Sequence, residues 1–161
     1  MPQDFNAQNN GFPNYHTHNG ADGTPYLDEE LSIVNTRRFI LYRCVGDLIN
    51  TSVANVVGGY LVMPFDGYVL DGGVGATVDT AGTTGTMTID INRNGTGILS
   101  TKISIETGET DSRDATTQPV LKPDMKKFSI GDRFSFDVDA IQSGTAAKGL
   151  TIFMNVVRAN F

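Results

Sequence analysis

Two histidines one residue apart are the most specific candidates for metal chemistry in the sequence. His16 and His18 flank Thr17 and are the only histidines among the 161 residues. Side chains at positions i and i+2 of an extended segment point to the same side, so both imidazoles can face one point. Imidazole suits ions such as Fe, Zn, Ni or Cu. Three chains around a threefold axis would supply six nitrogens, an octahedral set, whereas in a monomer the pair would be solvated or hydrogen-bonded.

The remaining reactive side chains are typical of structural positions. Cys44 lies in an apolar run that is typical of a strand, which favours a buried thiol over a nucleophile. Asp90, Asp137 and Asp139 could supply the carboxylate pair of a glycosidase, but they alternate with apolar residues and are expected on solvated strand faces. The motifs of serine hydrolases, phosphate-binding loops and zinc proteases are missing. We therefore predict that the protein is not an enzyme.

A group of acidic residues offers a weaker candidate for an ion site. Four carboxylates follow one another closely: Glu106, Glu109, Asp111 and Asp114. Carboxylate oxygens are ligands that calcium prefers, but the spacing differs from the D-x-D-x-D-G pattern of an EF-hand. A polar loop over residues 108–118 is the simpler interpretation.

The composition excludes several classes of protein. The net charge is −6 with 12 Lys and Arg residues, which argues against a protein that holds nucleic acid through phosphate contacts. No apolar run approaches the roughly 18 residues of a membrane helix, and the polar residues 1–10 do not suit a signal peptide. A single cysteine rules out a disulfide framework. With 39% apolar residues and 18 glycines, a turn-rich all-β domain is expected.

The N-terminal segment differs from the rest of the chain. Residues 1–26 are rich in Asn, Gln, Gly and Pro and lack helical or strand periodicity. Residues 27–36 suit a linker or one short helical turn. We predict that residues 1–36 form an extended arm that becomes ordered on a partner, with a flexible terminus as the alternative. Four spaced aromatic residues would anchor the arm: Phe5, Phe12, Tyr15 and Tyr26.

Strand patterns dominate residues 37–161, which we predict to form one β-sandwich domain. Polar and apolar residues alternate cleanly over 86–92, and Asn94-Gly95 is a strong turn signal because this pair tolerates positive φ. The returning strand is expected over 98–105. The other expected strands cover residues 39–45, 59–63, 65–80, 133–139 and 150–157.

The last expected strand is apolar on both faces. One face carries alternate apolar residues: Leu150, Ile152, Met154 and Val156. Phe153 and Val157 share the other face. Such a strand is usually covered on both sides, so Phe153 and Val157 are predicted to contact another subunit, with a place inside a sandwich as the alternative. The predicted fold is all-β, an antiparallel two-sheet sandwich that is jelly-roll-like, with an extended N-terminal arm.

Several segments resemble a class of bacteriophage virion proteins. HTHNGADGTP at 16–25 is similar to the His-x-His segment of many phage fibre and appendage proteins. The second half resembles jelly-roll domains of phage tail fibres, head fibres and capsid decoration proteins. Its landmarks are FDGYV (65–69), GTMTIDINRNGTGILSTKISIETGE (85–109), FSIGDRFSFDVDAI (128–141) and GTAAKGLTIFMNV (144–156). The resemblance implies that His16 and His18 hold an iron ion on the threefold axis of a trimer.

These features together predict a structural protein of the phage virion, assembled as a homotrimer in the bacterial host cytoplasm. The arm would anchor it to a capsid, portal-vertex or tail protein, as a capsid decoration, head-fibre or tail-fibre component. The expected cofactor is a transition metal, Fe or Zn, on the threefold axis. Neither nucleic acid nor a membrane is an expected partner.

The alternative function is a receptor-binding tip that recognises host-surface carbohydrate. Jelly rolls can carry lectin sites, although a fold alone does not establish function. A sugar site usually needs an exposed aromatic ring with polar neighbours. Because the chain has no tryptophan, Tyr60 and Tyr68 are the candidate rings. A capsule depolymerase is disfavoured, because the chain is short and offers no convincing acid–base pair.

Overall fold

The described part of the chain is all-β, as the sequence predicts. The computed structural model describes residues 38–44, as a strand, and residues 53–159. This part contains eleven strands and one short 3-10 helix. They are β1 (Arg38–Cys44), β2 (Leu61–Val62), β3 (Gly67–Thr77), β4 (Met87–Arg93), β5 (Thr96–Gly97), β6 (Leu99–Thr101), β7 (Ile103–Ile105), β8 (Val120–Leu121), η1 (Pro123–Met125), β9 (Lys127–Phe128), β10 (Arg133–Ala140) and β11 (Thr151–Arg158).

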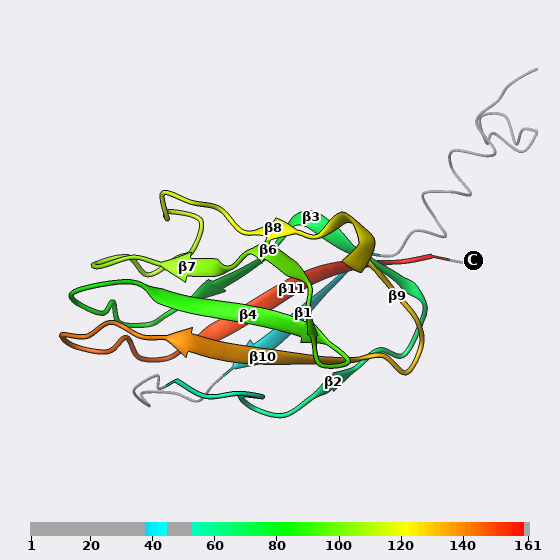
Figure 1. The fold of residues 1–161 in the computed structure, drawn as a ribbon, viewed down its shortest axis with the longest axis horizontal. Coiled ribbons are helices and arrows are strands. Elements are labelled where there is room, and N and C mark those ends of the chain that lie inside the picture. The colour runs from blue at the N-terminus through cyan, green and yellow to red at the C-terminus, as the bar shows by residue number, and fades with distance from the viewer. Residues whose placement is uncertain (1–37, 45–52, 160–161) are drawn as a thin grey trace, which may run out of the picture. The chain divides into compact units, whose positions relative to one another are not determined.

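The strands form three sheets, and each of their pairings is antiparallel. One sheet has four strands in the order β1-β11-β3-β9. A second has five strands, with the order β2-β10-β4-β5 and with β7 also paired to β4. A small sheet joins β6 to β8. In Figure 1, β4 and β10 lie in front of β11, so segments distant in sequence face each other.

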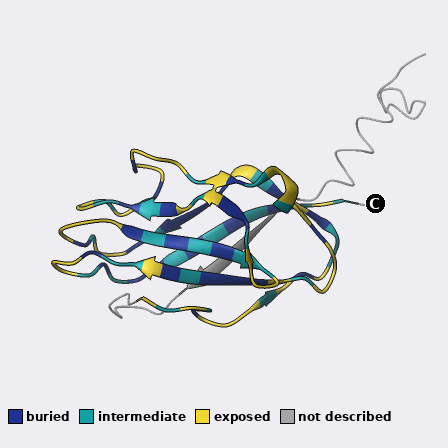
Figure 2. Cartoon of the chain, viewed as in Figure 1, coloured by how far each residue is buried: buried dark blue, intermediate teal, exposed yellow. Residues whose placement is uncertain are grey.

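The two larger sheets share one hydrophobic core. Ile91 of β4, Phe136 of β10 and Met154 of β11 all belong to it and are fully buried. Figure 2 shows buried residues alternating with less buried ones along β4, while exposed residues gather in the connecting loops. Burial of each such side chain contributes about 1.5–3 kcal/mol. The predicted inward face of the last strand is confirmed, because all four of its residues are buried: Leu150, Ile152, Met154 and Val156.

The predicted turn after residue 93 is confirmed. Arg93 of β4 pairs with Thr96 of β5, which leaves Asn94 and Gly95 as a two-residue connection. Their φ angles are 51° and 85°. Positive φ at both central residues is the geometry that matches the twist of a hairpin.

The prediction of one continuous returning strand over 98–105 is wrong. The chain forms two short strands there, β6 and β7, and β6 pairs with β8 instead of β4. The switch occurs at Ile98, whose N–H donates to the carbonyl of Ile91 while its own carbonyl accepts from Lys122. Ile98 and the next residue, Leu99, are both buried. Two consecutive buried residues break the period of two, so a flat strand cannot bury both on one face.

β3 is a long strand with a bulge that explains its loose alternation. Val69 pairs with Val156 and Val74 pairs with Met154, so residues 70–73 of β3 all lie opposite Asn155. Gly72 has a φ of 64°, which a residue without a Cβ adopts at little cost. The bulge lets Val69 and Val74 both reach the core although five positions separate them.

β2 is shorter than the strand predicted over 59–63. It comprises only Leu61–Val62. Gly58 and Gly59 have φ angles of 66° and 84°, so extended backbone cannot begin before residue 60. Tyr60 therefore lies directly before β2, which is the edge strand of its sheet.

The predicted arm, residues 1–36, lies outside the described residues. The same is true of the proposed metal ligands and aromatic anchors: His16, His18, Phe5, Phe12, Tyr15 and Tyr26. The side chain of Cys44 also lies outside them. Within the part of the chain that is described, no helix is long and apolar enough to cross a membrane.

Candidate functional site

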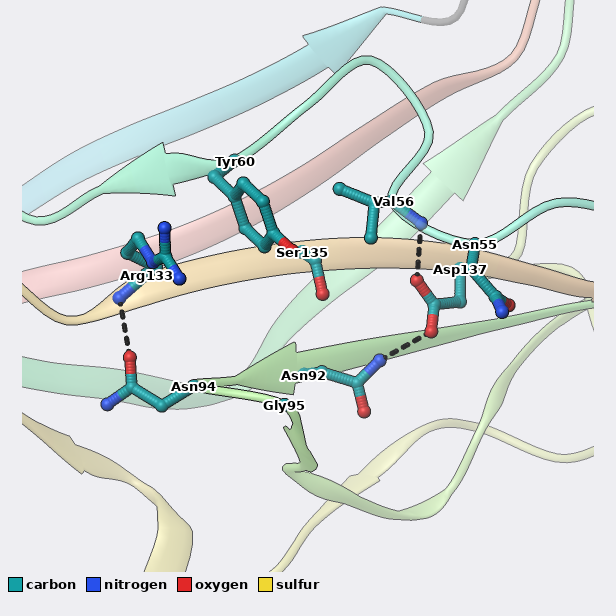
Figure 3. Close-up of a pocket in the computed structure, with 9 residues that line it drawn as sticks. All are labelled: Asn55, Val56, Tyr60, Asn92, Asn94, Gly95, Arg133, Ser135 and Asp137. Carbon is teal, nitrogen blue, oxygen red and sulfur yellow. Dashed lines mark hydrogen bonds between the residues drawn. The ribbon is translucent and has the colours of Figure 1, made fainter.

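A polar pocket of about 370 Å³ lies on the face of the five-stranded sheet that points away from the core (Figure 3). Its lining comes from three places in the sequence: the segment before β2, the end of β4 with its turn, and the first five residues of β10. The lining residues are Asn55, Val56, Tyr60, Asn92, Asn94, Gly95, Arg133, Ser135 and Asp137.

The alternation of β10 places its polar residues in the pocket. Phe134 and Phe136 point inward and are fully buried. Arg133, Ser135 and Asp137 therefore share the opposite face, because successive side chains of a strand point to opposite sides. Ser135 pairs with Asn92 of β4 in register, so this polar row continues onto the neighbouring strand.

Asp137 joins the three parts of the pocket. Its Oδ1 accepts a hydrogen bond of 2.8 Å from the backbone N–H of Val56. Its Oδ2 accepts one of 2.7 Å from Nδ2 of Asn92, and both bonds are drawn in Figure 3. One carboxylate thus holds the segment before β2 and strand β4 against β10.

The segment before β2 carries local backbone strain at the pocket. Val56 has a φ of 54°, a conformation that costs a β-branched residue of order 1–3 kcal/mol. Hydrogen bonds on either side keep it there: Ala54 exchanges two with Val138, and the N–H of Val57 donates to the carbonyl of Phe136. Strain of this kind is typical of binding and active sites.

Tyr60 and Arg133 form the other end of the pocket. Tyr60 is 51% exposed, and the guanidinium carbon of Arg133 lies 4.6 Å from the centroid of its ring. This is a cation–π contact, which contributes about 0.5–1 kcal/mol at an exposed site. Tyr68, the second ring predicted from the sequence, belongs to β3 and the four-stranded sheet. Only Tyr60 of the two lines the pocket.

The turn after β4 is fixed to the start of β10 by Asn94. Its Oδ1 accepts a 2.9 Å hydrogen bond from the N–H of Arg133, and its Nδ2 donates one of 2.7 Å to Asp132. Desolvation acts to raise the pKa of Asp132, but hydrogen bonds from the Ser129 N–H and from Asn94, together with the charge of Arg93, lower it. The turn and the Arg133 end of the pocket therefore depend on an ionised Asp132.

Several polar groups in the pocket remain available for a ligand. In the described part of the chain, no protein group is hydrogen-bonded to the side chains of Asn55 and Ser135 or to the guanidinium of Arg133. A carboxylate has about four lone-pair positions, and Asp137 uses one on each oxygen. Donors and acceptors thus converge on a cavity beside an exposed aromatic ring.

The other predicted carboxylates form local contacts. Lys102 Nζ lies 2.8 Å from Oδ2 of Asp139 and 3.4 Å from Oδ2 of Asp90. The hydrogen bond to Asp139 is the main cause that raises the pKa of Lys102. Asp90 and Asp139 lie on the solvent side of the five-stranded sheet, because each alternates with buried residues. Asp137 is the member of the predicted trio that enters the pocket.

The acidic loop also satisfies its carboxylates locally. Asp111 is paired with Arg113, whose hydrogen bond lowers the pKa of Asp111. Glu106 accepts hydrogen bonds of 3.1 Å from both the N–H and the hydroxyl of Thr116. Among the side chains of residues 53–159, no group of three from His, Cys, Asp or Glu is placed to hold a metal ion. This loop is a hydrogen-bonded polar loop in the structure.

Phe153 and Val157 lie on the face of β11 opposite the core. Both are half-buried, between fully buried neighbours such as Ile152 and Val156. Val157 pairs with Tyr68 of β3, and Phe153 pairs with Gly75. Their contact with another subunit stays a prediction.

The sequence alone does not single out most of the pocket. It marks Tyr60 and Asp137 individually, but it assigns Asn92, Ser135 and Arg133 only to polar faces of strands. The local signal is weak: Asn92 lies on the polar face just before the Asn94-Gly95 turn, and Ser135 lies on the polar face of another strand. Comparisons with protein-family models, with curated proteins and with solved structures found no match to this chain.

Proposed function

We propose that the chain is a structural protein of a bacteriophage virion that assembles as a homotrimer and is anchored by its N-terminal arm. The resemblance of residues 16–25 and 65–156 to phage appendage and decoration proteins supports it. The second stretch spans β3 to most of β11, so its landmarks coincide with the strands of the domain. The protein would reside in the virion, in the capsid decoration, head fibre or tail fibre.

A jelly-roll-like sandwich is the fold that we propose for this domain. The two larger sheets contribute to one core. Consecutive strands also alternate between those sheets: β2, β3 and β4 do so, and β9, β10 and β11 do so again. Alternation of this kind is what a Greek-key or jelly-roll connection requires.

The observation that best supports a trimer is that β11 has apolar side chains on both of its faces. Ile152 and Met154 fill the core on one side, while Phe153 and Val157 lie on the other. Tyr68, opposite Val157, extends this outer surface and is 38% exposed. We assign this surface, defined by Tyr68, Phe153 and Val157, to contacts between subunits, because a closed ring repeats one surface around its axis.

The arm would complete the assembly. Imidazoles of His16 and His18 from three chains suit an Fe or Zn ion on the axis. The spaced aromatic residues would bind a capsid, portal-vertex or tail protein, and the arm would become ordered as it docks.

The trimer is tested by placing a charge on the proposed interface. Light scattering of the full chain should give a mass near three chains, and Val157→Asp should reduce it to that of one chain. Val120→Asp is the matched control, because Val120 is an exposed valine on the small sheet. Tyr68→Asp provides a second interface variant if Val157→Asp fails to fold. A monomeric native chain, or trimers in both interface variants, would contradict this assembly.

A second candidate function is recognition of host-surface carbohydrate, and the pocket specifically favours it. An exposed tyrosine, Tyr60, contacts Arg133 and lines the same pocket as Asn92 and Asp137. Apolar ring faces of sugars stack on aromatic side chains, and their hydroxyls need the donors and acceptors that surround Tyr60. A virion protein with this pocket would serve as a receptor-binding tip.

A further inference from the structure

The pocket separates positive from negative charge along β10. Arg133 and Asp137 are its charged lining residues, and they lie four residues apart on one strand face. At about 3.4 Å per residue, their Cα atoms are about 14 Å apart, which exceeds the width of one sugar ring. The volume of about 370 Å³ lies in the lower part of the range of small-molecule sites. These dimensions suit a segment of two sugar rings.

The Arg133 end is suited to an anionic group. A guanidinium offers five N–H donors in a planar fork that matches a carboxylate. The contact with Tyr60, at 4.6 Å, is a cation–π interaction and uses none of these donors. In the described residues, no protein group is hydrogen-bonded to this guanidinium. The Tyr60 ring therefore positions the guanidinium, while its N–H groups can still donate to a ligand.

The Asp137 end is suited to hydroxyl groups. Asp137 retains an acceptor position on each oxygen after its bonds to Val56 and Asn92. The Oδ1 of Asn92 adds an acceptor, and Ser135 offers its hydroxyl between the two ends. An anion placed here would be repelled by Asp137, so the acidic group of a ligand belongs beside Arg133.

The overall charge limits how many acidic groups the ligand carries. The chain has a net charge of −6, which slows the approach of a polyanion. One carboxylate can be balanced by Arg133, whereas a second within the pocket would meet Asp137. A saccharide with a single acidic sugar in the bound segment satisfies both conditions.

We propose that the pocket binds a two-ring saccharide segment that contains one uronic acid. Its carboxylate pairs with the guanidinium of Arg133, one ring packs against Tyr60, and hydroxyls of the neighbouring sugar donate to Asp137 and Asn92. This assignment rests on the carbohydrate-binding function proposed above and adds the chemical class of the ligand.

The test is a glycan array that displays uronate-containing disaccharides beside their carboxyl-reduced neutral partners. The full chain should bind the acidic member of a pair at least about tenfold more tightly, as expected for charge-assisted hydrogen bonds. Arg133→Gln should lower acidic binding to the level of the neutral partner. Arg133→Lys should fall between, because it keeps the charge and loses the fork.

Matched variants locate the site. Tyr60→Ala should weaken binding of every disaccharide, whereas Val120→Ala removes an exposed side chain of the small sheet, outside the pocket, and should have no effect. Arg113→Gln removes an exposed guanidinium from the polar loop and should leave the acidic preference unchanged.

The possible outcomes separate the acid preference from carbohydrate recognition itself. Equal binding of the acidic and the carboxyl-reduced member of each pair would overturn the proposed selection of the acid by Arg133. It would not contradict carbohydrate recognition. Binding that survives both Tyr60→Ala and Arg133→Gln would place the sugar outside this pocket and overturn the assignment. Failure to bind any disaccharide on the array would overturn carbohydrate recognition together with the acid preference.

Discussion

The backbone N–H of Val56 donates a 2.8 Å hydrogen bond to Oδ1 of Asp137, across 81 residues of sequence. The other oxygen of Asp137 accepts from Asn92. One carboxylate therefore fixes the segment before β2 and strand β4 on either side of β10. The shape of the pocket depends on this one side chain.

Replacing Asp137 by Asn should destabilise the domain. An amide has one oxygen, so either Val56 or Asn92 would face an NH2 group in place of an acceptor. We expect the free energy of unfolding to fall by about 1–3 kcal/mol, measured by urea denaturation. Asp139→Asn is the control on the same strand. It removes an exposed ion pair with Lys102, which is worth less than about 1 kcal/mol. Equal losses in the two variants would argue against a special role for Asp137.

Replacing Val56 by Gly should relieve backbone strain. The N–H that donates to Asp137 is retained, and a φ of 54° no longer carries a steric cost. We expect the free energy of unfolding to stay constant or rise by about 1 kcal/mol. Val53→Gly, at an exposed valine nearby, should instead lower it through the added flexibility of the unfolded chain. A clear loss of stability in Val56→Gly would show that the valine side chain is required there.

Replacing Asn94 by Gly should loosen the turn without changing its backbone conformation. Glycine tolerates the φ of 51°, but the hydrogen bonds to Arg133 and Asp132 disappear. We expect a loss of about 1 kcal/mol and faster hydrogen exchange at the amide of Arg133. Thr96→Ala, at an exposed residue next to the turn, should leave that exchange rate unchanged. Unaltered exchange in Asn94→Gly would contradict the coupling of the turn to β10.

Acid should destabilise the domain in part through Asp132. Its pKa is lowered in the folded state below the ordinary value of 3.8. Its contribution to stability is therefore present above the unfolded pKa and is lost as pH falls through the folded pKa. Asp132→Asn should flatten the decline of unfolding free energy between about pH 5 and pH 2. Part of the decline should remain, because the pKa of Asp111 is lowered as well.

A control separates Asp132 from acid denaturation in general. Thr96→Ala changes an exposed residue next to the same turn and removes no carboxylate. Its decline between about pH 5 and pH 2 should match that of the native chain. Identical pH profiles for Asp132→Asn and Thr96→Ala would exclude the turn as the acid-sensitive element.

The sequence predicts the strands well where local patterns suffice. The alternation over residues 86–92 and 150–157 identifies β4 and β11, and the Asn94-Gly95 pair identifies the turn. These features depend on neighbours in sequence, since a period of two and a tolerance of positive φ are local properties.

The sequence fails where long-range pairing decides the outcome. The local pattern predicts that Ile98 and Leu99 belong to one strand paired with β4. In the structure, Leu99 pairs with β8 instead. The pocket has the same origin: Asn92 and Ser135 become neighbours only through the pairing of β4 with β10. The alternation within one strand does not show which residues of another strand lie opposite it. Polar residues of β4 and β10 could therefore be assigned to strand faces, but not to one shared site.

The measurement that tests the proposed virion trimer most directly is mass and metal content on one sample of the full chain. Light scattering should give three chains per particle, and mass spectrometry should find about one Fe or Zn per trimer, as six imidazoles on an axis require. His16→Ala combined with His18→Ala should abolish the metal. A metal-free monomer would contradict the threefold assembly, and metal retained by the double variant would contradict the assignment of His16 and His18 as its ligands.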